Sequence, residues 1–83
     1  MTQTYDEATT VLDARGLLCP MPIVKTAQAM KGLAPGQVLK LLTTDRGSVA
    51  DVPAWAQSTG NELLEWHEDD GGFVFLVRKG EEM

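Results

Sequence analysis

The sequence predicts an α/β (α+β) two-layer sandwich in which two helices cover one face of a four-stranded mixed sheet. Three observations lead to this prediction. The chain has 83 residues, which suits one small domain with a single core. Segments with strand patterning and helix patterning follow one another in the order β-α-β-α-β-β. The last two strand segments are separated by a short turn sequence that is typical of a hairpin.

The first predicted elements are a short strand and a helix. Residues 10–14 form a strand candidate that ends at a turn containing Arg15 and Gly16. From Pro22 onward, apolar residues recur with helical spacing and lie within about a third of the helical circumference. Lys25 falls on the opposite, wetter side. The predicted core-facing stripe consists of Ile23, Val24, Ala27 and Met30.

A turn and a second strand come next. Gly32 suits the position after a helix, and Pro35-Gly36 suits the centre of a type II turn. Residues 37–44 then predict a strand with apolar side chains on both faces, one of which is interrupted by Lys40.

The second helix has two possible starting points. Residues 48–51 resemble a capping box with aspartate in the acidic position, which would open a helix to about residue 59. Pro53 conflicts with this register because its ring would clash with the carbonyl of Val49. Asp51 as the N-cap, with Pro53 in the first turn, removes the conflict. The sequence leaves both registers open.

Two strands close the domain. Residues 62–68 and 73–79 are joined across the turn sequence at 69–72. Alternation gives each strand one apolar face, with Leu64 and Trp66 together on the first. Trp66 is predicted in the core, and so is Trp55 of the second predicted helix, because tryptophan side chains are on average highly buried. The domain is expected to span residues 9–80, with a flexible N-terminal tail at 1–8 and a C-terminal tail at 81–83.

Composition narrows the class of function. The net charge is −5, and the seven basic residues are scattered among twelve acidic ones, which argues against direct nucleic-acid binding. The acidic C-terminal half is expected to be a solvated face. No apolar run approaches the roughly 20 residues that span a membrane. The N-terminal residues have neither a basic nor an apolar signal region, so a cytoplasmic location is expected.

The single cysteine, Cys19, marks the place to look for chemistry. One thiol makes no disulfide within the chain, and one sulfur is too few for a soft metal site. Cys19 lies where the first strand gives way to the first helix. Cys19 is one candidate for the N-cap of this helix. Met21 is the other, because Met21 precedes Pro22 and a residue before proline avoids helical geometry. In both cases the positive end of the helix is expected to favour the thiolate.

The neighbours of Cys19 limit what this thiolate can do. Arg15 and Lys25 could add positive charge, although each can equally be a solvated surface residue. Hydrolytic chemistry normally needs a base, and the chain has one histidine, His67, in a predicted strand. Thioredoxin-type chemistry needs a second cysteine. A lone exposed thiolate can accept a sulfur atom as a persulfide and pass it to another thiol.

At this point the sequence resembles a known family, the TusA/SirA-like sulfur carrier proteins. Residues 12–22 read LDARGLLCPMP, which resembles the family's strand, glycine and Cys-Pro-x-Pro signature at the expected spacing. The resemblance extends to about residue 79. Further matches are Lys25, the Pro35-Gly36 turn, residues 51–53 (Asp-Val-Pro) and residues 77–80 (Val-Arg-Lys-Gly).

The resemblance implies a sulfur carrier that holds sulfane sulfur as a persulfide on Cys19. Carriers of this kind receive sulfur from a cysteine desulfurase or a rhodanese-like donor. They deliver it to protein acceptors, such as those of DsrE/TusD-like type, for tRNA thiolation, molybdenum-cofactor maturation or sulfur oxidation. Such a protein acts with partners rather than as a self-sufficient enzyme, and it is expected to be a monomer without cofactor or metal. Some relatives carry another cysteine in the second helix, where this chain has Trp55 and Ala56.

The motif residues around Cys19 have expected supporting roles. Gly16 is expected to permit a positive-φ turn, and Asp13 to bond the turn backbone. Met21 falls away from the apolar stripe and is a candidate docking contact. The predicted site is Cys19 as the persulfide carrier, supported by Pro20, Pro22, Gly16, Asp13, Arg15 and Lys25.

Two rival hypotheses remain open at the level of the sequence. In the first, the chain is a non-catalytic interaction module and Cys19 is a structural residue at the helix start. In the second, it is a redox-sensing or hydrolytic protein that pairs Cys19 with His67. The carrier hypothesis predicts one modifiable cysteine and no sizeable small-molecule pocket.

Overall fold

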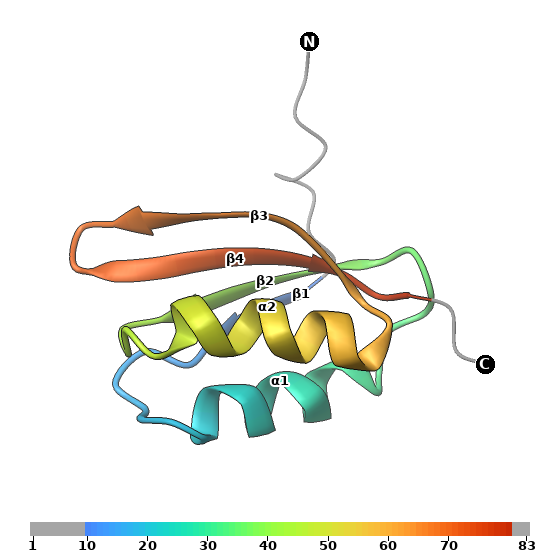
Figure 1. Cartoon of the computed structure of the whole chain (residues 1–83). Coiled ribbons are helices and arrows are strands. Elements are labelled where there is room, and N and C mark those ends of the chain that lie inside the picture. The colour runs from blue at the N-terminus through green and yellow to red at the C-terminus, as the bar shows by residue number, and fades with distance from the viewer. Residues whose placement is uncertain (1–9, 81–83) are drawn as a thin grey trace, which may run out of the picture.

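The computed structural model describes residues 10–80 and has the predicted order of elements (Figure 1). The predicted tails at 1–8 and 81–83 lie outside the described residues. No helix within the described range is long and apolar enough to cross a membrane. The elements are β1 (Thr10–Asp13), α1 (Met21–Met30), β2 (Val38–Thr43), α2 (Ser48–Thr59), β3 (Glu62–Asp69) and β4 (Gly72–Arg78).

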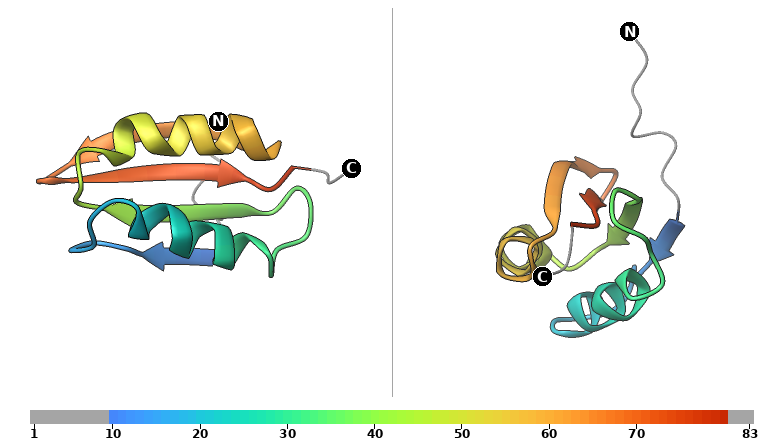
Figure 2. Two further views of the ribbon diagram at one scale, coloured as in Figure 1. Left: turned by 60° about the horizontal axis from the view of Figure 1, so that its bottom comes forward. Right: turned by 90° about the vertical axis from the view of Figure 1, so that its right-hand side faces the viewer.

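The four strands form one mixed sheet in the order β1-β2-β4-β3. β1 and β2 are parallel, whereas β4 is antiparallel to both β2 and β3. Both helices cover the same face of this sheet (Figures 1 and 2). The predicted α/β (α+β) sandwich with two helices on one face is confirmed. The parallel pair places the ends of β1 and β2 at the same edge of the sheet, where α1 and α2 begin.

The core lies between the helices and the two central strands. Alternate residues of β4 face the helices: Phe75 and Val77 are fully buried and Phe73 nearly so. Leu39 and Leu41 of β2 join them, together with Val52 of α2 and Met30 of α1. Burying such side chains contributes roughly 1.5–3 kcal/mol each to folding.

The buried face of α1 differs from the predicted stripe. The buried residues of α1 are Pro22, Thr26 and Met30, spaced four apart, whereas Val24 keeps 40% of its surface exposed. Thr26 is tolerated in the core because its hydroxyl donates to the Pro22 carbonyl at 2.7 Å. The predicted stripe is therefore right for Met30 and for Ile23, which packs against the core, but wrong for Val24, and it misses Thr26.

The predicted apolar face of β3 is also wrong in part. A β-bulge between Leu63 and Glu65 interrupts the alternation, so that Leu63, not Leu64, packs against the core. Trp66 stacks on Phe75 with ring centroids 5.8 Å apart but remains 41% exposed. Trp55, in contrast, packs against the core as predicted.

The start of α2 settles the choice between the two registers. The helix begins at Ser48 with Gly47 as its N-cap, and Pro53 lies inside it. The register with Asp51 as N-cap is therefore wrong, and Asp51 lies in the first turn. Ser48 is the first helical residue and makes no capping hydrogen bond, so the predicted capping box is wrong as well.

The predicted turns are present. The Gln37 N–H donates to the Ala34 carbonyl at 3.1 Å across the Pro35-Gly36 turn. The β3–β4 hairpin turns through Asp70 (φ 51°) and Gly71 (φ 86°), two positive angles that a type I′ turn requires.

Candidate functional site

Cys19 lies in the exposed loop between β1 and α1. At this end of the molecule the β1–α1 loop, the β2–α2 loop and the β3–β4 hairpin come together, as Figures 1 and 2 show. The N-cap of α1 is Pro20, so neither Cys19 nor Met21 is the cap. The Cys19–Pro20 peptide bond is cis. Cys19 is the residue immediately before the N-cap of α1.

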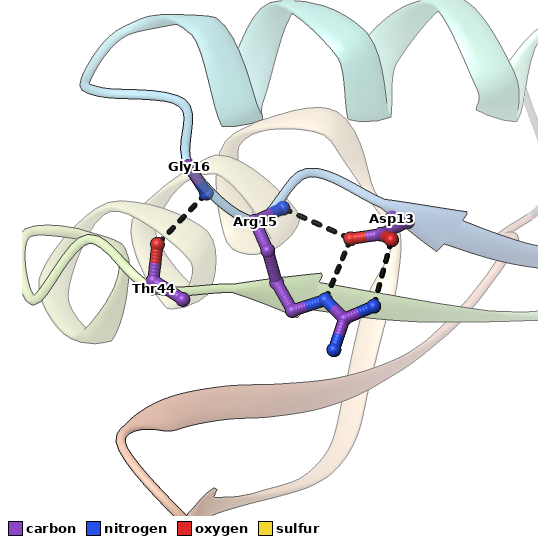
Figure 3. Close-up of polar contacts among 4 residues, drawn as sticks. All are labelled: Asp13, Arg15, Gly16 and Thr44. Carbon is purple, nitrogen blue, oxygen red and sulfur yellow. Dashed lines mark hydrogen bonds and ion pairs between the residues drawn. The ribbon is translucent and has the colours of Figure 1, made fainter.

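The loop before Cys19 is held by two sets of polar contacts (Figure 3). One Asp13 oxygen accepts the backbone N–H of Arg15 at 3.1 Å and its Nε–H at 2.8 Å, and the other accepts Nη2–H at 2.8 Å. Gly16 adopts φ +85°, and its N–H donates to Thr44 Oγ1 at 2.9 Å. Asp13 thus bonds the turn backbone, and Gly16 takes the positive φ, as predicted.

The predicted positive charge is not at the thiol. Arg15 is paired with Asp13, and this guanidinium lowers the pKa of Asp13 to about 2. Lys25 is exposed on α1. The charged side chains that act on Cys19 are instead two carboxylates.

Cys19 donates a hydrogen bond to each of these carboxylates. Its backbone N–H donates to Asp45 Oδ2 at 3.0 Å, and its Sγ–H donates to Asp51 Oδ2 at 3.1 Å. The hydrogen bond to Asp51 raises the pKa of the Cys19 thiol, and desolvation and the negative charges of Asp51 and Asp45 raise it further. The expectation that the thiolate is favoured is therefore wrong for this chain by itself.

The reason for this error is topological. The first turn of α2 places Asp51 beside a thiol that is 32 residues away in sequence. A carboxylate at hydrogen-bonding distance outweighs the partial charge of a helix end, which falls off within the first turn. Parallel pairing of β1 with β2 is the signal that could have revealed this, because residues after both strands then meet at one edge. Asp45 follows β2 closely and belongs to the same edge.

His67 is not a partner of Cys19. It lies in β3 opposite Val74, and Val74 alternates with the core residues Phe73 and Phe75, so that His67 points to the face away from the helices. The hydrogen bond of the thiol goes to Asp51. The geometry therefore gives no support to a Cys-His dyad.

The two motif prolines have different surroundings. Pro20 is exposed and caps α1, whereas Pro22 is buried in its first turn. A missing N–H at these positions has no cost, since the first N–H groups of a helix lack intrahelical partners.

Exposed apolar side chains flank Cys19 in the sequence and continue into the first turns of α1. Leu18 is 72% exposed, Met21 41% and Val24 40%. These residues, here called the apolar strip, are spaced three apart, so that Met21 and Val24 share one face of α1. Exposed apolar groups beside a reactive atom are typical of a surface that another protein covers.

A pocket of about 450 Å³ lies at the opposite end of the sheet from Cys19. Its lining residues come from the α1–β2 turn, the α2–β3 turn and the end of β4. The expectation that the chain lacks a sizeable pocket is thus not met, although Cys19 does not line this one. The lining consists of Pro35, Gly36, Gly60, Glu62, Arg78, Lys79 and Gly80.

Comparison with known proteins decides the family. The family model of the sulfurtransferase TusA matches residues 10–79, which include every described strand and helix. This chain belongs to the TusA family. The sulfur carrier protein TusA of Allochromatium vinosum is 48% identical over 68 residues, which cover 82% of this chain and 90% of that protein.

Other relatives agree in sequence and in structure. YrkF of Bacillus subtilis is 53% identical over 76 residues, but this chain spans 41% of that protein's length. The crystal structure of a SirA-like protein from Desulfitobacterium hafniense has a TM-score of 0.71 and 28% identity, covering 88% of this chain and 100% of that one. The TusA-family sandwich is thus the fold of this chain.

Proposed function

We propose that this protein is a sulfur carrier that holds sulfane sulfur as a persulfide on Cys19 and relays it between partner proteins. The observation that carries the proposal is the single, exposed cysteine at the end of the sandwich where the loops converge, in a chain of the TusA family. Relatives bearing the name sulfur carrier protein support the same role.

The chemistry requires one nucleophilic sulfur and a docked donor. Sγ of Cys19 attacks the terminal sulfur of a donor persulfide and forms a new S–S bond. The donor's own S–S bond breaks, and its electron pair stays on the donor thiol, which takes up the proton lost from Cys19. Delivery is the same reaction with an acceptor thiol as the nucleophile. The sulfane sulfur is transferred without net oxidation or reduction.

Partners complete this function. A cysteine desulfurase or rhodanese-like protein would supply the sulfur, and an acceptor of DsrE/TusD-like type would receive it in tRNA thiolation, cofactor maturation or sulfur oxidation. The apolar strip, with Met21 at its centre, would provide the docking contact. The proposal includes a cytoplasmic location, because thiols stay reduced there.

One observation favours the alternative of a non-catalytic interaction module. The thiol donates a hydrogen bond to Asp51, as a structural cysteine at a helix start would. The two functions differ in whether the sulfur of Cys19 is needed.

Intact-protein mass spectrometry separates the two functions. We expect wild type treated with polysulfide, or with a cysteine desulfurase and cysteine, to gain about 32 Da per sulfur atom, reversed by a reductant. The Cys19→Ser variant should gain nothing, because serine oxygen forms no persulfide. Circular dichroism of both proteins establishes that they are folded. A folded wild type that gains no mass would refute the carrier function and leave the interaction module.

A further inference from the structure

The thiol of Cys19 lies among negative charges contributed by separate parts of the fold. Asp51 comes from α2 and Asp45 from the loop after β2, and both contact Cys19. The neighbouring arginines are engaged elsewhere. Arg15 pairs with Asp13, and Arg46 lies over the Phe73 ring and 3.8 Å from Glu68. The groups that shift the titration of Cys19 are thus both acidic.

The two states of a carrier respond differently to such surroundings. An empty thiol is neutral and donates its proton to Asp51 Oδ2. A persulfide carries no hydrogen on Sγ, so it cannot make this bond. Persulfides are also more acidic than the parent thiols, so the loaded state tends to be an anion, which nearby carboxylates repel.

We propose that Asp51 makes Cys19 a weak holder of sulfur: its carboxylate stabilises the empty thiol and repels the loaded persulfide, so that the carrier releases sulfur to acceptors readily. This inference rests on the proposed function and adds to it a residue that sets the sulfur affinity of the site. Asp51 contacts the reacting atom directly, whereas Asp45 contacts the backbone of Cys19.

The exchange that measures this affinity is balanced. An empty Cys19 thiol and a small persulfide anion yield the Cys19 persulfide anion and the small thiol. One S–S bond breaks, one S–S bond forms, and the thiol proton moves to the departing sulfur. No oxidant or reductant takes part. The position of this equilibrium reports how strongly Cys19 holds the sulfur relative to the small thiol.

The test compares Asp51→Asn with wild type at equilibrium with glutathione persulfide and glutathione at a fixed ratio. Asparagine keeps the size of the side chain and removes its charge. We expect the ratio of loaded to empty protein, read by intact mass, to rise about threefold or more near neutral pH. The difference should shrink at acidic pH, where the persulfide is neutral. Asp70→Asn, the same change on the exposed hairpin, should behave as wild type.

A second measurement needs no sulfur loading. The pH profile of Cys19 alkylation by iodoacetamide should shift to lower pH in Asp51→Asn but not in Asp70→Asn, because the thiolate no longer faces a carboxylate. An unshifted profile, or equal sulfur loading of Asp51→Asn and wild type, would overturn the role of Asp51. Failure of the wild type to take up any sulfur would instead refute the carrier function, with the alkylation profile still testing the contact.

Discussion

Asp13 and Arg15 show how one residue pair shapes the loop that leads to Cys19. The Arg15 guanidinium and backbone N–H both bond the Asp13 carboxylate, which holds the turn in one geometry. Because the pKa of Asp13 is lowered to about 2, the pair stabilises the folded chain above the ordinary pKa of 3.8. That contribution is lost as the pH falls from there through about 2.

This pair gives a prediction about titration. We expect the Asp13 carboxyl carbon, followed by NMR, to titrate with a midpoint near the pKa of about 2 in wild type. In Arg15→Ala the midpoint should move up towards 3.8, because the guanidinium is the main cause of the shift. Arg46→Ala removes another exposed arginine, which pairs with Glu68, and should leave Asp13 unchanged. Equal Asp13 midpoints in wild type and Arg15→Ala would contradict the pairing.

Residues that act within one short segment can be predicted from the sequence. Asp13, Gly16 and Cys19 lie in one short segment that runs from the last residue of β1 into the β1–α1 loop. The local roles of Asp13 and Gly16 follow from turn chemistry. The contact between Asp51 and Cys19 cannot be predicted in the same way, because it depends on how β1 and β2 pair. The predicted electrostatics failed for this reason, although the local contacts of Asp13 and Gly16 were predicted.

At the scale of the elements, periodicity predicts the kind of each segment better than its facing side. All six segments are present in the expected order. The bulge in β3 reverses the roles of Leu63 and Leu64, and no composition signal marks an inserted residue. On α1, the hydroxyl of Thr26 donates a hydrogen bond to the Pro22 carbonyl of the same helix, so this polar residue can occupy a core position. A prediction from apolar residues alone does not find it.

Pro53 leads to a prediction about the stability of α2. Because proline has no N–H, the Val49 carbonyl lacks its helical partner, and the ring crowds that carbonyl. We expect Pro53→Ala to raise the free energy of unfolding, by about 1–3 kcal/mol, in urea denaturation. Pro35→Ala makes the same change in a turn, where proline restricts the unfolded chain, and should lower it by about 0.4–1 kcal/mol. A destabilised Pro53→Ala would show that the proline ring contributes packing instead.

At the scale of the whole molecule, the topology separates the stable core from the site. The core is formed by the middle of β2 and β4 beneath the helices, whereas Cys19 and Asp45 lie on loops at one end, next to the first turn of α2 that carries Asp51. Partners can therefore approach the thiol without disturbing the core. The apolar strip begins at the same end as Cys19, which suits a docking surface for the proposed sulfur transfer.

Met21 is the residue through which this docking surface can be tested. We expect Met21→Gln to slow sulfur loading from a cysteine desulfurase by about three- to tenfold, because the partner then covers a polar group. Loading from polysulfide, which needs no docking, should stay unchanged by intact mass. Val11→Thr removes apolar surface from an exposed residue of β1 and should leave both rates unchanged. If Met21→Gln slows both reactions alike, Met21 acts on the thiol itself and the docking role is wrong.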